Sequence, residues 1–196
     1  MLNAKPVTKA FRLKYKSNNI TLQLLFVEIK AMSKVYSFKT VQKIPISLDL
    51  AWNFFSSPDN LKEITPAKLD FHIISKYHAE KMYEGQLIEY TVKPILGIPL
   101  YWMTEMTHIK DKQYFIDEQR FGPYSLWHHQ HHFKEIDGGI EMTDIVHYKL
   151  PLWFLSDIAN VLMVRNQLRD IFRFRFEAVE TKFGKWDGGQ KAEIIF

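Results

Sequence analysis

The chain has 196 residues, a length that suits one domain with a sizeable core, and its formal net charge is +4. It contains no cysteine, which excludes a disulfide framework and thiol chemistry, so nothing points to an oxidising compartment and we expect the cytoplasm. Beyond a basic N-terminal segment there is no dense basic stripe and no apolar run long enough for a bilayer, so neither nucleic acid binding nor a membrane span is expected.

Residues 1–31 look unlike the rest of the chain. Five basic side chains precede the first acid, Glu28, and Ile20 to Ile29 is apolar enough for a strand. No small-residue cleavage site follows, so a secretory signal is not expected. Because Met32 resembles a protein start, we interpret residues 1–31 as an appendage that is not part of the native domain, with an extra edge strand as the alternative.

The next stretch predicts one strand, two short helices and three more strands. Residues 35–44 alternate between polar and apolar side chains, as in a strand. Ser47 precedes a helical spacing of apolar residues from Leu48 to Phe55 and is expected to cap that helix. Ser57 is expected to cap a second short helix that has Pro58 at its first position. Strands are then predicted over residues 69–76, 86–94 and 100–110.

The segment from Phe115 to Leu150 is divided by turn residues into three pieces of strand length. Because side chains alternate faces along a strand, two groups of inward-facing residues are predicted. The first group is Trp127, His129, His131 and Phe133, and the second is Met142, Asp144, Val146 and Tyr148.

The turn at Asp137-Gly138-Gly139 leaves two registers open for the hairpin. If Asp137-Gly138 is the loop, His131 lies opposite Asp144; if Gly138-Gly139 is the loop, His131 is the diagonal neighbour of Asp144. Either register places an imidazole and a carboxylate on one aromatic-rich face. Such a face suits the wall of a ligand cavity.

A long final helix is predicted from a cap at Ser156 or Asp157 to about Phe183, with Gly184 as its stop. Its expected apolar stripe consists of Ile158, Val161, Leu162, Leu168, Ile171, Phe172 and Val179. An antiparallel sheet must cover its apolar face, and this helix is long enough to do so. The predicted fold is therefore α+β, with a curved antiparallel sheet wrapped around a long C-terminal helix, two short helices after the first strand, and an internal cavity. Residues 32–184 form this domain, and residues 185–196 are expected to be a flexible tail.

Short motifs also occur in a particular order along residues 35–184. They are the run Ser56 to Leu61 with Ile64-Thr65-Pro66, Gly85, the segment ending at Trp102, Thr104-Glu105-Met106, the spaced Phe115, Asp117 and Gln119, Gly122-Pro123, the spaced Trp127, His129, His131 and Phe133, Asp137-Gly138-Gly139, Thr143-Asp144, Tyr148, Leu150-Pro151, and Ile171-Phe172 with Arg175. With these motifs the chain resembles the START-like superfamily, also called SRPBCC or helix-grip proteins, and looks closest to its ligand-binding branch near polyketide cyclases and dehydratases. The resemblance implies a cavity for a hydrophobic ligand, lipids included, and does not imply one reaction.

We therefore expect binding of a small, largely hydrophobic molecule, without a cofactor. The expected ligand-contacting residues are Trp102, Asp117, Gln119, Trp127, His129, His131, Phe133, Asp144 and Tyr148. The alternatives are a cyclase-like or dehydratase-like enzyme with His131 as base beside Asp144, and an interaction module with a vestigial cavity. A buried pair of purely structural role is weighed equally with ligand contact.

A metal site is the other interpretation of the histidine-rich strand. His129 and His131 offer two ligands, but the third would have to be Asp144 or Asp117, and the four neighbouring histidines divide between two faces. We expect no metal site.

Overall fold

The computed structural model describes residues 34–75, 81–95, 97–151 and 158–196. The interpretation of residues 1–31 and the predicted cap at Ser156 or Asp157 fall outside the described residues. The described strands are β1 (Tyr36–Ile44), β2 (His72–Ile73), β3 (Leu87–Ile95), β4 (Ile98–Lys110), β5 (Tyr114–Phe121), β6 (Leu126–Ile136), β7 (Gly139–Lys149) and β8 (Glu193–Ile195). The described helices are α2 (Leu48–Phe55), the 3₁₀ helices η1 (Pro58–Ile64) and η2 (Ala67–Leu69), and α3 (Ile158–Phe183).

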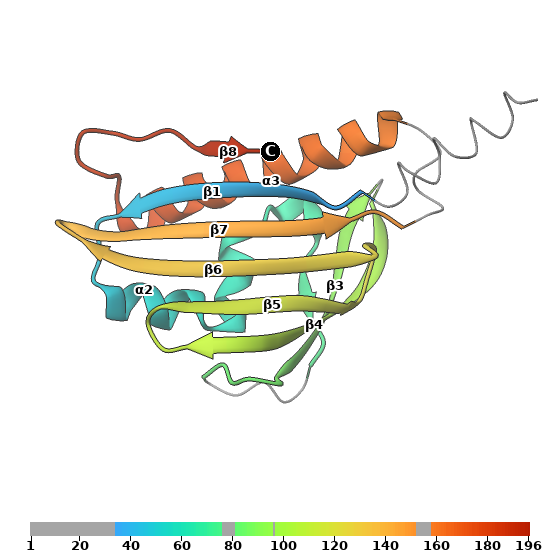
Figure 1. Ribbon diagram of the computed structural model, residues 1–196, viewed down its shortest axis with the longest axis horizontal. Coiled ribbons are helices and arrows are strands. Elements are labelled where there is room, and N and C mark those ends of the chain that lie inside the picture. Colours follow the sequence, from blue (N-terminus) through green and yellow to red (C-terminus); the bar gives the residue numbers. More distant parts are fainter. Residues whose placement is uncertain (1–33, 76–80, 96, 152–157) are drawn as a thin grey trace, which may run out of the picture.

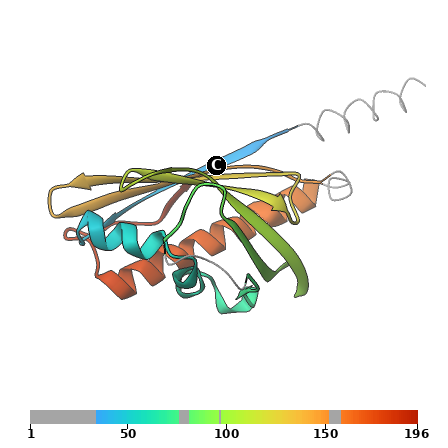
Figure 2. The same ribbon diagram turned by 90° about the horizontal axis from the view of Figure 1, so that it is seen from below.

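The strands form one antiparallel sheet in the order β2-β3-β4-β5-β6-β7-β1-β8 (Figure 1). Figure 2 shows α3 running beneath the curved sheet, with α2 and the 3₁₀ helices on the same side. A sheet with one apolar face needs such a cover. The predicted α+β helix-grip fold is confirmed. Among the described residues, no helix has the length and apolar character needed to cross a membrane.

The two short helices differ in type. Ser47 caps α2 as predicted, and its hydroxyl oxygen accepts a hydrogen bond from the backbone N–H of Leu50 at 3.3 Å. The second helix is a 3₁₀ helix, η1, with Pro58 at its start and no side-chain hydrogen bond from Ser57. The fixed φ of proline suits this first position and removes an N–H that would have no partner in the helix.

The prediction of a strand over residues 69–76 is wrong for most of these residues. The chain instead forms η2, after which Asp70 takes a left-handed conformation with φ 46°, and only His72–Ile73 pairs as β2. Apolar and polar residues alternate here because Leu69 and Phe71 are buried, and not because the backbone is extended. A left-handed residue interrupts a strand because it reverses the direction of the backbone.

The hairpin between β6 and β7 has the first of the two predicted registers. Ile136 pairs with Gly139, so Asp137-Gly138 is the loop, and His131 lies directly opposite Asp144. Gly138 has φ +81°, a conformation that favours glycine. A Cβ atom at Gly139 would lie 2.2 Å from the carbonyl oxygen of Ile44, so the turn also needs glycine for its close approach to β1.

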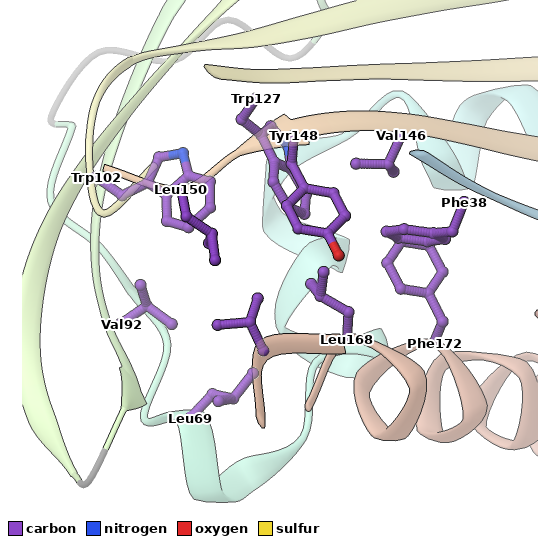
Figure 3. Close-up of a cluster of buried hydrophobic side chains, with 11 residues drawn as sticks. Phe38, Leu69, Val92, Trp102, Trp127, Val146, Tyr148, Leu150, Leu168 and Phe172 are labelled. Atoms are coloured by element: carbon purple, nitrogen blue, oxygen red, sulfur yellow. The ribbon is translucent and has the colours of Figure 1, made fainter. Parts of the chain in front are cut away.

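The core lies between the sheet and α3. Figure 3 shows Trp127, Tyr148 and Phe38 from the sheet together with Leu168 and Phe172 from α3. The buried residues of α3 include Val164, Leu168, Phe172, Phe176 and Val179. Leu162, expected on this stripe, is 52% exposed. It lies two positions before Val164, which places it about 200° around the helix on the other side.

The C-terminal segment is a further correction, because a flexible tail was expected there. Glu193–Ile195 pair with β1 as strand β8, and the ring of Phe196 lies 5.3 Å from that of Phe38. The guanidinium groups of Arg165 and Arg169 lie over the Phe196 ring, at 4.5 and 5.2 Å from its centroid. Without β8, the backbone N–H and C=O groups along this side of β1 would lack strand partners, which explains why a short terminal segment pairs there.

Candidate ligand-binding cavity and its histidine–carboxylate cluster

A cavity of about 200 Å³ lies between the sheet and the helices that cover it. Its wall is mostly apolar and includes Val92, Trp102, Trp127, Leu168, Ile171 and Phe172. Figure 3 shows part of this wall, with Val92 and Trp102 on the strands and Leu168 and Phe172 on α3. An apolar cavity of about 150 Å³ accommodates one benzene molecule, so this space suits a ligand of about one substituted ring.

Five of the nine predicted contact residues line the cavity. They are Trp102, Asp117, Trp127, His129 and His131. They come from β4, β5 and β6, and the alternation of side chains along these strands directs them to the helix side. The inner face predicted for the middle strand is therefore the face that borders the cavity.

The other four predicted residues lie away from the cavity wall described above. Gln119 binds the backbone of Tyr124, donating to its carbonyl at 2.6 Å and accepting from its N–H at 3.2 Å. Phe133 packs against Trp52 at a centroid distance of 5.5 Å, within the second part of the core. Tyr148 is a core residue.

Asp144, the fourth of these residues, contacts both inner histidines without lining the cavity itself. With Asp117, His129 and His131 it forms what we call the histidine–carboxylate cluster. Nε2 of His129 donates to Oδ1 of Asp144 at 3.1 Å, and Nδ1 of His131 lies 2.8 Å from the same oxygen. That second contact is close but does not have hydrogen-bond alignment.

Asp117 contacts the same two histidines from the cavity side. Nε2 of His131 donates to Oδ2 of Asp117 at 3.0 Å, and Nδ1 of His129 is 3.5 Å from that oxygen. Asp117 pairs with His129 across β5 and β6, which explains why a carboxylate from a third strand reaches both rings. The ring of Phe115 stacks on His131 at a centroid distance of 4.1 Å and restricts its orientation.

Arg175, which our list of expected contact residues did not include, joins the cluster from α3. Its guanidinium is 3.8 Å from Oδ1 of Asp144, and the residue also lines the cavity. The signal that could have found it is helical spacing, because Leu168, Phe172 and Arg175 fall at i, i+4 and i+7 on the covering face.

Burial and mutual contact set the charges of the cluster. Burial would raise the pKa of Asp144, but the charge of Arg175 and the hydrogen bonds of the histidines hold that pKa well below its usual value. Burial likewise opposes ionisation of Asp117, and the nearby His129 and His131 keep its pKa lowered. Both carboxyl groups are therefore ionised.

The two imidazoles respond in opposite directions. Burial lowers the pKa of His129, and the neighbouring charge of His131 lowers it further. Burial also opposes the charge on His131, but its contacts with Asp117 and Asp144 outweigh burial and raise its pKa. His131 is thus the more readily protonated ring, in the direction expected from its pairing with Asp144.

The remaining two histidines of β6 lie on the other face of the sheet, as predicted. His128 contacts Glu118 at 2.8 Å, and His132 contacts Gln130 at 3.0 Å. Neither residue lines the cavity. The four histidines therefore divide into an inner pair and an outer pair.

Comparison with known proteins identifies the fold of the chain. No protein-family model matches the chain. No curated protein sequence matches it either. Among solved structures, the chain is similar to protein Ms6760 from Mycobacterium smegmatis, with a TM-score of 0.55 and 14% identity over 76% of this chain and 96% of that one.

Two further solved structures show the same architecture. Ara h 8.0201 superposes with a TM-score of 0.52 and 16% identity, over 76% of this chain and 98% of that one. Major latex-like protein 151 from Panax ginseng superposes with a TM-score of 0.53 and 13% identity, over 76% and 97% of the two chains. The protein thus has the helix-grip fold, the architecture of the START-like superfamily that its motifs resemble. At these identities the likeness concerns the fold.

Proposed function

We propose that the protein binds a small, largely apolar molecule in the cavity beneath the sheet, with the polar end of that molecule against the histidine–carboxylate cluster. The observation that supports this most directly is an apolar cavity of about 200 Å³ whose wall contains the buried His129 and His131 together with the partly buried Asp117. Ligand sites commonly combine apolar walls with a few convergent polar groups.

The position of the charged groups supports the same proposal. Buried charges are costly unless they are paired, and within this cluster Asp117, Asp144, Arg175 and a protonated His131 balance one another. Asp117 and His131 nevertheless line the cavity, so Asp117 can accept a hydrogen bond from a ligand hydroxyl and His131 can donate one to a ligand oxygen. The apolar part of the ligand would then contact Trp102 and Trp127.

The test is a binding measurement on the full chain. Freshly purified protein is examined by native mass spectrometry for a retained apolar molecule, and a small aromatic fluorescent probe is then titrated while tryptophan fluorescence is followed. Trp102 and Trp127 line the cavity, so their emission should change when the probe binds.

A filled cavity provides the matched comparison. Ile171→Trp places a large ring in the space beside Phe172, whereas Leu162→Trp adds the same ring on the exposed side of α3. Because each variant adds a tryptophan, the emission of the probe itself is followed in this comparison. We expect the first variant to weaken probe binding at least roughly tenfold, and the second to leave it unchanged. Equal affinities in both variants, with both folded, would contradict a ligand site in this cavity.

An enzymatic role is the second candidate, and the opposite pKa shifts of the two inner histidines favour it. Neighbouring titratable groups with diverging pKa values are typical of acid and base pairs. His131, with the raised pKa, would act as the acid, and His129, with the lowered pKa, would act as the base, in a cyclase-like or dehydratase-like reaction. Turnover of a bound compound that is lost in His129→Gln, with binding retained, would favour the enzyme.

A further inference from the structure

We propose that Asp117, His129 and His131 form a site for a divalent transition-metal ion of the zinc class, with its open coordination position facing the cavity. One oxygen of Asp117 and one nitrogen of each histidine lie within 4.8 Å of one another. Two histidines and one carboxylate are a ligand set that suits zinc, and a site with three protein ligands keeps a position for water or substrate.

The distances between the ligand atoms fit a shared ion. Oδ2 of Asp117 lies 3.0 Å from Nε2 of His131 and 3.5 Å from Nδ1 of His129. Two atoms that bind one ion at about 2.1 Å lie about 3.0 Å apart in octahedral geometry and about 3.4 Å apart in tetrahedral geometry. The two separations from Oδ2 of Asp117 are close to this range, and the histidine nitrogens lie within 4.8 Å of each other, so the rings would move together to complete the site.

Asp144 occupies the position of an orienting carboxylate. Each histidine presents one nitrogen to Asp117 and its other nitrogen to Oδ1 of Asp144, at 3.1 Å for His129 and 2.8 Å for His131. Metal-bound histidines characteristically donate their second N–H to such a carboxylate, which fixes the ring and its tautomer. The His129 contact is such a hydrogen bond, whereas the His131 contact would need a small rotation of the ring to become one. Arg175, 3.8 Å from the same oxygen, helps to hold Asp144 in place.

Protonation of His131 balances the formal charges of the cluster but does not satisfy both imidazole rings. Their centroids are 3.8 Å apart, so both rings cannot carry a charge without strong repulsion. A neutral ring that donates its N–H to Asp144 has its other, unprotonated nitrogen facing the Asp117 carboxylate. A nitrogen lone pair and a carboxylate oxygen, both hydrogen-bond acceptors, then face each other. A cation between these acceptors removes the conflict and leaves both histidines neutral.

The metal site is proposed independently of ligand binding. The inference about which molecule occupies its open coordination position rests on the proposed ligand-binding function. Asp117, His129 and His131 all line the cavity. With a divalent ion, two carboxylates and one guanidinium, the site carries one net positive charge. An anionic oxygen balances this charge, so we infer that the preferred ligand is a small apolar molecule with a carboxylate, phenolate or enolate oxygen.

Direct metal titration tests the site in the full chain. The protein is freed of metal with a chelator, and Zn²⁺ or Co²⁺ is added while stoichiometry is measured by elemental analysis and Co²⁺ by its visible d–d absorption. We expect one ion per chain, a raised melting temperature and, with Co²⁺, paramagnetic broadening that is strongest for the ring signals of His129 and His131 and weaker for those of His132.

Variants on the two faces of β6 provide matched comparisons. His131→Gln should weaken Zn²⁺ binding more than Asp144→Asn, for which a roughly 10–100-fold loss of affinity is expected of an orienting residue. His132→Gln and His128→Gln, on the outer face, should leave it unchanged. Failure of the folded wild-type chain to bind either ion, or broadening confined to the outer histidines, would overturn the proposal without any variant.

Different results would contradict the metal site and the ligand-binding function. Metal binding without binding of the aromatic probe, or of its carboxylate-bearing analogue, would retain the site and remove the ligand function. Probe binding that is identical with and without Zn²⁺, in a protein that binds the ion, would overturn the inferred anionic ligand.

Discussion

Replacing Phe172 by alanine is expected to lower the free energy of unfolding by about 3 to 5 kcal/mol. The side chain is 6% exposed. Its ring lies edge-on to Phe38 with centroids 4.7 Å apart, and 5.8 Å from the ring of His129. The substitution removes these contacts and leaves a void. Because one side of the Phe172 ring faces the cavity, fewer packing contacts are lost than at a fully enclosed site, and we expect a loss near the lower end, about 3 kcal/mol.

Urea denaturation of three variants measures this effect. Phe172→Leu keeps most of the volume and should lose less than the alanine variant. Leu162→Ala changes a residue of the same helix that is 52% exposed, and should alter stability by no more than about 0.5 kcal/mol. A loss below about 1 kcal/mol for Phe172→Ala, or equal losses at the two positions, would show that α3 does not cover the sheet with this face.

Three further predictions concern the cluster and the C-terminus. With chelator present, Asp144→Asn should lower the pKa of His131, followed by NMR titration of the ring signals; an identical pKa in both proteins would disprove the pairing. The pKa of Asp144 is lower in the folded protein than its usual value near 3.8, so the ionised carboxylate stabilises the fold fully above that value, and this contribution is lost as the pH falls toward the folded pKa. Urea denaturation at decreasing pH should therefore show a smaller decrease in the free energy of unfolding for Asp144→Asn than for the wild type. Deleting residues 193–196 should lower the melting temperature, because β8 and Phe196 cover β1 and Phe38; an unchanged melting temperature would mean that β8 adds no stability.

Properties that depend on neighbouring residues could be predicted from the sequence. Strand parity placed His129 and His131 on the inner face and His128 and His132 on the outer face, because side chains alternate along any strand. The Asp137-Gly138 turn limited the hairpin to two registers, both with an imidazole near Asp144. Helical spacing likewise indicated the length of α3 and its stop at Gly184.

Local patterns were less reliable where the chain departs from regular geometry. The left-handed Asp70 ended the strand expected over residues 69–76, since hydrophobic alternation reports burial and not backbone direction. Leu162 was placed on the buried stripe because it is apolar, although its position around the helix opposes Val164.

Tertiary structure alone decided how the site is assembled. Asp117 reaches both inner histidines because β5 pairs with β6, and Arg175 reaches Asp144 because α3 packs against β1, the neighbour of β7 in the sheet. Phe196 and β8 complete the edge beside β1 from the far end of the chain. The sequence by itself determined which side chains share a face, since that depends on local periodicity. Which faces meet, and therefore the cluster and its charges, depends on contacts between distant segments, whose energies no local pattern contains.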